Sequence, residues 1–336
     1  MNRIALKLSS VLGAAAFVLT CGGCPNSSNS GTTTSGGQTK PAVSGGQQAS
    51  TGQKFVIGMS QCNLGEPWRV QMDKDIKEEA GKHPEIEIIE RDAQNKSETQ
   101  QAQMREFIQQ HVSLIIISPK ESRPLTKPVE EAMDAGIPVI VLDRKIEGDK
   151  FTCFIGGDNT KIGKAAGEYI KKILNGTGEI VELKGLMTST PAQERHNGFM
   201  EGIKGSSIKV VADPDCQWLE PNANREMKSI LSTHPKVDLV YGHNDPSAHG
   251  AYMAASQEGK GREKQIKFVG IDSLPTEGVK YVKDGVLTAT FQYPTGGKEA
   301  IETALKILKK EPFEKTITLG TRIFTKDNAE KGGEAL

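Results

Sequence analysis

From Lys54 to the end of the chain, short apolar runs alternate with longer amphipathic stretches. The run 114–118 is almost wholly apolar, as a strand buried on both faces of a parallel sheet requires. The stretch 67–81 carries Val70, Ile76 and Ala80 at helical spacing and stops at Gly81. The same reasoning predicts strands at 55–60, 87–91, 114–118, 139–142, up to 155, 179–183, 208–211, 238–242, 266–271 and 287–292, and helices at 67–81, 99–111, 127–135, 160–174, 193–203, 225–233, 247–258, 276–284 and 295–309.

Regular alternation of strands and helices predicts parallel sheets with right-handed crossovers. The second half of the pattern echoes the first, because a strand–helix–strand unit ends at Asp143 in one half and at Asp272 in the other. We therefore expect an α/β protein of two doubly wound parallel-sheet lobes. If the lobes face each other, the carboxyl ends of both sheets border one cleft, where ligands bind in such folds.

The N-terminal part differs from this pattern. Basic residues in 1–7 precede a short apolar stretch at 11–19, which suits an export signal and is too short for a membrane span. Small residues directly before Cys24 predict a lipoprotein signal peptide at 1–24 with Cys24 lipidated, although Cys21 competes for that role, and a plain secretory signal is the alternative. Residues 25–53 are rich in Ser, Gly and Thr, and are predicted to form a disordered tether.

Composition narrows the range of partners. The 336 residues include 42 Lys and Arg and 42 Asp and Glu, so the formal net charge is zero. That balance removes the electrostatic argument for binding nucleic acid. Cys62, Cys153 and Cys216 lack metal-type spacing and are expected to be separate thiols, with one disulfide left open. The histidine spacing indicates no metal site, and no cofactor is expected.

Candidate binding residues gather at the ends of the predicted strands. Both tryptophans of the chain, Trp68 and Trp218, follow strands and offer flat apolar faces. Charged and amide side chains, namely Asp143, Arg144, Arg195, Asn244 and Asp272, occupy equivalent strand ends. Flat faces combined with fixed donors and acceptors indicate recognition of a neutral sugar ring.

Seven segments in this order resemble the type I periplasmic sugar-binding proteins, in particular the ribose- and galactofuranose-binding branch. They are GMSQ from Gly58, PWR from Pro67, IPVIVLDR from Ile137, GDN from Gly157, ER from Glu194, YGHND from Tyr241 and FVGID from Phe268. The resemblance extends from about residue 54 to 324. It implies a first lobe of 54–157 plus 293–321, a second lobe of 158–292 plus 322–336, and a three-segment hinge near 157, 292 and 322.

The resemblance also implies roles for individual residues. Asp143 and Arg144 would bind sugar hydroxyls from the first lobe. Trp68 and Trp218 resemble the aromatic positions that sandwich the ring, and Gln292 or Tyr293 lies near the family's hinge glutamine. The remaining implied ligand residues are Arg195, Asn244 and Asp272 in the second lobe, with Glu66 and Arg69 beside Trp68.

Some of these residues have structural alternatives. Asp143 and Arg144 could form a surface ion pair at a strand end. Asp245 is predicted to cap the helix that starts at Pro246, which leaves Asn244 for the ligand.

The loop before the first helix carries further alternatives. Glu66 could serve only as a favourable charge at a helix N-terminus. Trp68 could be an ordinary core residue that does not contact the ligand. The same alternative applies to Trp218. Arg69 is either a cleft contact or solvated.

The predicted function is that of an exported, monomeric binding protein that closes on a monosaccharide and delivers it to an ABC-transporter permease. A membrane sensor kinase is the alternative partner. A lactose-repressor-type regulator would need an N-terminal helix-turn-helix where this chain has an export signal. An exported enzyme acting on sugars would need a carboxylate pair with room for water, so a non-enzymatic role is expected.

Overall fold

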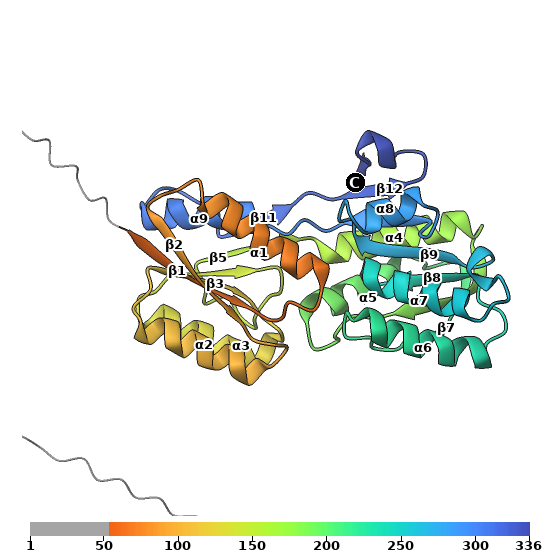
Figure 1. Cartoon of the computed structure of the whole chain (residues 1–336), viewed down its shortest axis with the longest axis horizontal. Coiled ribbons are helices and arrows are strands. Elements are labelled where there is room, and N and C mark those ends of the chain that lie inside the picture. The colour runs from red at the N-terminus through yellow and green to blue at the C-terminus, as the bar shows by residue number, and fades with distance from the viewer. Residues whose placement is uncertain (1–53) are drawn as a thin grey trace, which may run out of the picture. The chain divides into compact units, whose positions relative to one another are not determined.

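The computed structural model describes residues 54–336, and the predicted signal peptide and tether lie outside the described residues. Two sheets organise this part of the chain (Figure 1). The first has six strands in the order β11-β5-β4-β3-β1-β2, and all of its pairings are parallel. Its strands are β1 Phe55–Gln61, β2 Ile86–Asp92, β3 Leu114–Ser118, β4 Val139–Leu142, β5 Cys153–Gly157 and β11 Thr316–Leu319.

Helices cover both faces of the first sheet because its strands alternate apolar side chains between the two faces. Ile116 and Ile140 pack with helices α1 and α9, whereas Ile115 and Ile117 pack with α2 and α3. The helices are α1 Pro67–Ala80, α2 Ser97–Gln109, α3 Ser122–Asp134 and α9 Gly297–Leu308.

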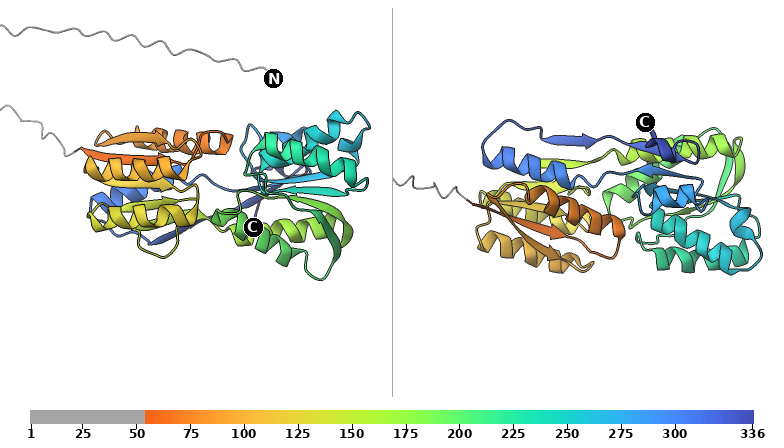
Figure 2. Two further views of the ribbon diagram at one scale, coloured as in Figure 1. Left: turned by 90° about the horizontal axis from the view of Figure 1, so that it is seen from below. Right: turned by 45° about the horizontal axis from the view of Figure 1, so that its top comes forward.

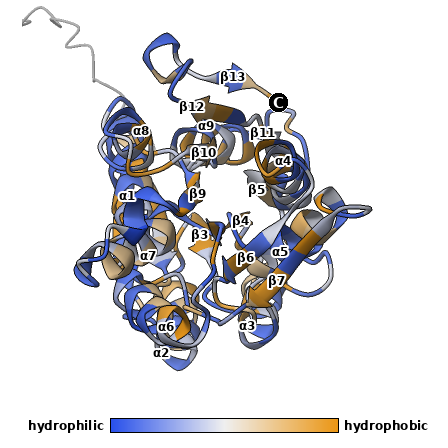
Figure 3. Cartoon of the chain, turned by 90° about the vertical axis from the view of Figure 1, so that its right-hand side faces the viewer, coloured by the Kyte–Doolittle hydropathy of each residue, from blue (hydrophilic) through white to orange (hydrophobic). Residues whose placement is uncertain are grey.

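The second sheet has seven strands in the order β13-β12-β10-β9-β8-β6-β7, with β12 and β13 antiparallel at one edge. Helices α4 and α5 lie on one face and α6, α7 and α8 on the other. In Figure 3 apolar positions gather on the strands, and polar positions mark the outside of the surrounding helices. The strands are β6 Thr177–Leu183, β7 Ser207–Ala212, β8 Leu239–Gly242, β9 Lys267–Asp272, β10 Ala289–Gln292, β12 Arg322–Thr325 and β13 Glu334–Ala335, and the helices are α4 Asn159–Ile173, α5 Thr190–Gly202, α6 Glu220–Thr233, α7 Asp245–Gln257 and α8 Gly278–Lys283.

Three segments carry the chain between the sheets: β5 to α4, β10 to α9, and β11 to β12 (Figure 2). The predicted fold class, two doubly wound parallel-sheet lobes with a three-segment hinge, is confirmed. The assignment of domains to 54–157 plus 293–321 and 158–292 plus 322–336 stays a prediction. We use first lobe and second lobe for these two sets below.

Several element bounds differ from the predictions. Helix α3 begins at Ser122 instead of 127, and α6 begins at Glu220 instead of 225. In α6 the polar first turns concealed a start that Pro221 signals, since proline suits the first turn of a helix. Strands β11, β12 and β13 were not predicted, because none of them contains a long apolar run, and β11 alternates exposed and half-buried positions.

Helices α4 and α5 pack backbone against backbone through glycines. A Cβ at Gly163 would lie 2.3 Å from the carbonyl oxygen of Arg195, and one at Gly198 would lie 2.2 Å from that of Thr160. At Gly167 and Gly202 a Cβ would lie 2.6 and 2.4 Å from carbonyl oxygens of the facing helix. This contact fixes the helix that carries Arg195.

We predict that Gly198→Ala lowers the free energy of unfolding by roughly 2 kcal/mol, because the new methyl group must force the two helices apart. Urea denaturation measures the effect. The control is Gly320→Ala, where a Cβ would meet nothing within 4 Å, and which should leave stability within about 0.5 kcal/mol of the parent. Equal stability of Gly198→Ala and the parent would contradict the packing argument.

Candidate ligand-binding site

A small cavity lies between the lobes. All predicted ligand residues except Gln292 line it: Glu66, Trp68, Arg69, Asp143 and Arg144 from the first lobe, and Arg195, Trp218, Asn244 and Asp272 from the second. Pro191 and Tyr293, which were not among the predicted ligand residues, also line it.

The carboxylate of Asp143 is the most heavily paired group of the first-lobe wall. Arg69 Nη1 lies 2.8 Å from Asp143 Oδ2, and Tyr293 Oη donates to Oδ1 over 2.9 Å. Burial acts to raise the pKa of Asp143, but the charges of Arg69 and Arg144 outweigh it and hold the pKa below its usual value. The surface-ion-pair alternative is wrong, because Asp143 and Arg144 are only 4% and 2% exposed.

Arg195 and Asp272 form the charged part of the second-lobe wall. Arg195 donates from Nε to Asn159 Oδ1 over 2.8 Å and from Nη1 to the carbonyl oxygen of His243. Its Nη1 lies 3.8 Å from Asp272 Oδ1, which is too long for a hydrogen bond. Burial raises the pKa of Asp272 well above its ordinary value despite this arginine. Because this arginine is too distant for a hydrogen bond, the carboxyl group of Asp272 keeps hydrogen-bonding capacity for a ligand.

The roles predicted for Asn244 and Asp245 require a correction. Asn244 caps α7, since its Oδ1 accepts from the Ser247 N–H over 3.0 Å. Asp245 is fully buried and accepts from the Ser273 N–H and from Thr290 Oγ1, at 2.7 and 2.6 Å. It thereby holds the turn after β9, where Asp272 has a φ of 131° and Ser273 a φ of 57°. Asn244 still borders the cavity, but its amide is committed to structural bonds.

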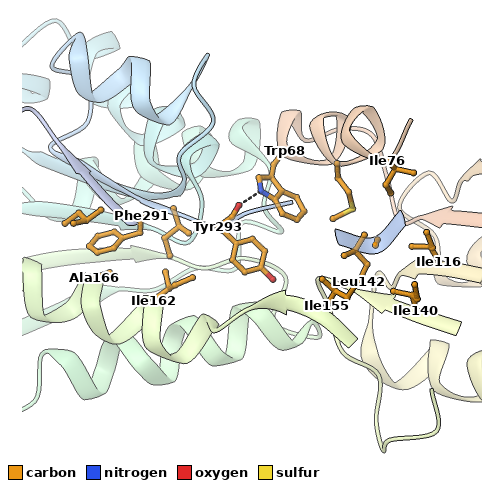
Figure 4. Close-up of a cluster of buried hydrophobic side chains, with 14 of the residues drawn as sticks. Trp68, Ile76, Ile116, Ile140, Leu142, Ile155, Ile162, Ala166, Phe291 and Tyr293 are labelled. Carbon is orange, nitrogen blue, oxygen red and sulfur yellow. Dashed lines mark hydrogen bonds between the residues drawn. The ribbon is translucent and has the colours of Figure 1, made fainter. Parts of the chain in front are cut away.

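The two tryptophans differ in their contacts within the protein. Trp68 Nε1 donates to the carbonyl oxygen of Tyr293 over 2.8 Å, and the two rings lie 5.3 Å apart (Figure 4). Trp68 also belongs to the buried apolar cluster, so it is both a core residue and part of the cavity wall. Trp218 lies in the β7–α6 loop with Arg195 and Arg144 over its ring, at 5.2 and 5.6 Å.

Gln292 lies outside the cavity, and Tyr293 lines it instead. Gln292 ends β10 beside Asp272 of β9, and its backbone carbonyl accepts from Thr321 Oγ1 over 2.6 Å. Successive residues of an extended segment point in opposite directions, so a shift of one position exchanges the two side chains. The family resemblance placed Gln292 or Tyr293 near the hinge glutamine, and Gln292 was the predicted ligand residue, because spacing alone did not separate the two.

A buried acid–histidine group around Glu182 was missed. His196 Nδ1 lies 2.9 Å from Glu182 Oε2, and His243 Nε2 lies 2.9 Å from Oε1. Burial acts to raise the pKa of Glu182, but these hydrogen bonds outweigh it and lower the pKa to about 2. His243 Nδ1 accepts from the Gly185 N–H, which assigns its proton to Nε2. An acid inside the apolar run of β6 was the available signal, since a buried charge needs partners.

The charges and free donors of the cavity set its chemistry. Three carboxylates, on Glu66, Asp143 and Asp272, face three guanidinium groups. Over residues 54–336, Arg69 Nε, Arg144 Nε and Trp218 Nε1 are buried nitrogens without a hydrogen-bond partner. The same range contains neither a cluster of three or more candidate metal ligands nor a helix with the length and hydropathy of a membrane span.

Comparison with known proteins agrees with this geometry. Residues 57–312 match the model of the periplasmic binding protein domain. The ribose import binding protein RbsB of Bacillus subtilis (strain 168) is 32% identical over 288 residues, which cover 85% of this chain and 90% of that protein. The chain belongs to the periplasmic binding protein family.

Other members of the family show similar agreement. The galactofuranose-binding protein YtfQ of Escherichia coli (strain K12) is 30% identical over 288 residues, 82% of this chain and 90% of that protein. A solved fructose binding periplasmic domain of a hybrid two component system is 44% identical, with a TM-score of 0.80, and covers 83% of this chain and 93% of that one. The predicted family and type I fold are confirmed.

In this periplasmic binding protein the lobes also touch at the surface. Lys145 Nζ lies 2.7 Å from Glu194 Oε1, and the Lys145 N–H donates to Thr190 Oγ1 over 3.0 Å. Lys145 directly follows Arg144, and Glu194 directly precedes Arg195. The ion pair is partly exposed, so it is worth at most about 1 kcal/mol. Such a contact biases closure without deciding it.

We predict that Lys145→Glu lowers the ratio of closed to open protein about threefold, because it sets two like charges across the lobes. Adding Glu194→Lys restores the opposite charges and should restore the ratio. Single-molecule energy transfer between dyes on the two lobes measures it. The control is Lys150→Glu, whose partner Asp134 lies in the same lobe. If the charge-swapped protein stayed as open as the single variant, the pair would have no role in closure.

Proposed function

We propose that this chain captures a neutral monosaccharide between its two lobes. The observation that carries the proposal is the cavity that both lobes line, with three carboxylates balanced by three arginines. Balanced charges disfavour phosphorylated or acidic sugars, which would bring unpaired charge into a buried site. A sugar hydroxyl both donates and accepts, so hydroxyls can satisfy the carboxyl group of Asp272 and the buried N–H groups of the wall.

The relatives narrow the sugars to test first. These relatives are named for binding ribose, galactofuranose and fructose. The fructose-binding domain is 44% identical, compared with 32% and 30% for the ribose and galactofuranose proteins. We therefore place D-fructose first in the panel, followed by D-ribose, galactofuranosides and D-allose.

The test is a thermal-shift screen of the protein with this panel. A ligand at about one hundred times its dissociation constant stabilises a protein by about 2.7 kcal/mol, so the correct sugar should raise the melting temperature clearly. Fructose 6-phosphate and gluconate should not. Absence of any shift across the panel would refute the monosaccharide proposal.

The carboxylates give a matched pair of variants. Asp272→Asn should weaken sugar binding by roughly 2 kcal/mol, yet raise the stability of the sugar-free protein. Its raised pKa means that ionising Asp272 costs folding free energy as the pH rises above its ordinary 3.8. Asp143→Asn should weaken binding and also cost about 3 kcal/mol of stability, because it leaves Arg69 buried without its partner. Calorimetry and urea denaturation separate the two, and equal losses of stability would contradict this assignment.

Our proposal is one of binding without turnover. Both oxygens of Asp143 already accept, Oδ2 from Arg69 and Oδ1 from Tyr293. That leaves Asp143 poorly placed to activate water, as a sugar-cleaving pair of carboxylates must.

For delivery, we propose that the closed protein acts as a monomer and docks on an ABC-transporter permease. The similarity to import binding proteins supports this partner. The fructose-binding domain of a hybrid two component system favours the alternative, a membrane sensor kinase.

We propose further that the protein is exported and held to the membrane by a lipid on Cys24. The support is the sequence around Cys24, since this residue lies outside the described range. Cys24→Ala should move the protein from the membrane fraction to the soluble fraction with sugar binding unchanged, as immunoblots of cell fractions would measure. Cys21→Ala is the matched control and should stay with the membrane. A parent protein found only in the soluble fraction would rule the anchor out.

A further inference from the structure

Trp218 is held in an unusual backbone conformation. Its φ is 71°, and that of Gln217 before it is 56°. Bulky residues rarely adopt positive φ, and each such position costs on the order of 1–3 kcal/mol unless its surroundings compensate. Two consecutive cases in one loop indicate that the position of this side chain is closely determined.

The surroundings of the loop supply that compensation. Asn244 Nδ2 donates to the carbonyl oxygen of Trp218 over 3.0 Å, and the Gln217 N–H donates to Asp215 Oδ1 over 2.8 Å. Gly185 lies directly against the indole, since a Cβ there would come within 2.3 Å of Cε2. The ring is thus fixed by bonds to its backbone and by a neighbour without a side chain.

Despite this fixation, the indole N–H has no partner. Trp218 is 5% exposed, and within the described range its Nε1 makes no hydrogen bond. An unpaired buried N–H costs about 1–3 kcal/mol. Trp68 provides the contrast, because its Nε1 is satisfied by the carbonyl oxygen of Tyr293 at 2.8 Å. Both indoles line the same cavity, but only that of Trp218 keeps a free donor.

We propose that the Trp218 indole N–H donates a hydrogen bond to one oxygen of the bound sugar and thereby determines specificity at that position. The inference rests on the proposed function and deepens it. The ligand is a neutral sugar with a hydroxyl or ring oxygen facing the second-lobe wall. A site built to bond a hydroxyl discriminates strongly against an analogue without it, because the site's own polar group is then left unpaired. Trp218 therefore contributes a hydrogen bond from its indole N–H as well as the apolar contact of its ring face.

The test combines Trp218→Phe with a series of mono-deoxy D-fructoses, using calorimetry to measure each dissociation constant. Phenylalanine keeps a flat ring and removes the N–H. The variant should bind D-fructose about fivefold more weakly. For the one analogue that lacks the accepting oxygen, variant and parent should bind equally. If the ring oxygen accepts, every deoxy analogue should show the fivefold loss, and the carbocyclic analogue should show none.

Trp68→Phe is the matched control. It should weaken every analogue, the carbocycle included, by one common factor, since the bond that it removes lies within the protein. Trp218→Phe also removes part of a buried ring, so the melting temperature of the sugar-free protein is measured beside binding to separate a loss of packing from the loss of the N–H. If the phenylalanine variant fails to fold, benzothienylalanine at position 218 replaces the N–H by sulfur with little change of shape.

Two results would overturn the inference while leaving the proposed function intact. One is unchanged binding of D-fructose by Trp218→Phe. The other is a common factor of loss for every analogue, the carbocycle included. If D-fructose fails but D-ribose binds the parent, the deoxy-ribose series takes its place. If no sugar of the panel binds the parent protein, the proposed function and this inference fail together.

Discussion

The tyrosine at the second hinge segment is the group that connects the two lobes at the cavity. Tyr293 Oη donates to Asp143 Oδ1 and lies 3.4 Å from Asn159 Nδ2, and Asn159 Oδ1 accepts from Arg195. This polar chain runs from a first-lobe residue of the cavity wall, Asp143, to a second-lobe residue of the same wall, Arg195. The Tyr293 carbonyl also accepts from Trp68. One residue thus joins both lobes, the hinge and the cavity wall.

Burial explains why such a chain is needed. Charged side chains removed from water lose several kcal/mol of hydration each unless partners replace it. Asp143 recovers this loss within the protein, whereas Asp272 and three N–H groups on the wall do not. These polar groups without hydrogen-bond partners lie at the cavity and come from both lobes. A bound polyol that supplied the missing partners would stabilise the closed form more than the open one, which is the condition for ligand-driven closure.

The sequence predicted what depends on local pattern and strand ends. Buried parallel strands such as 114–118 can be predicted from their continuous apolar residues, and ligands bind at the carboxyl ends of such strands. Prediction failed where one residue of register decides the outcome. Asn244 has the cap role that was expected of Asp245, Asp245 instead holds the turn after β9, and the choice between Gln292 and Tyr293 stayed open. Neighbouring polar residues look equivalent in a sequence, but backbone geometry sends their side chains in different directions.

Other features were hidden because they depend on partners distant in the chain. Glu182 is a plain acid in the sequence and becomes a buried anion only because His196 and His243 reach it from two other elements. Through the bond from Gly185 to His243, this group steadies the glycine that lies against Trp218. The sequence neighbours Arg144 and Lys145, and likewise Glu194 and Arg195, also depend on partners that are distant in the chain. Each pair places one side chain in the cavity and the next at the lobe surface. The surface contact between Lys145 and Glu194 therefore lies directly beside two arginines of the cavity wall.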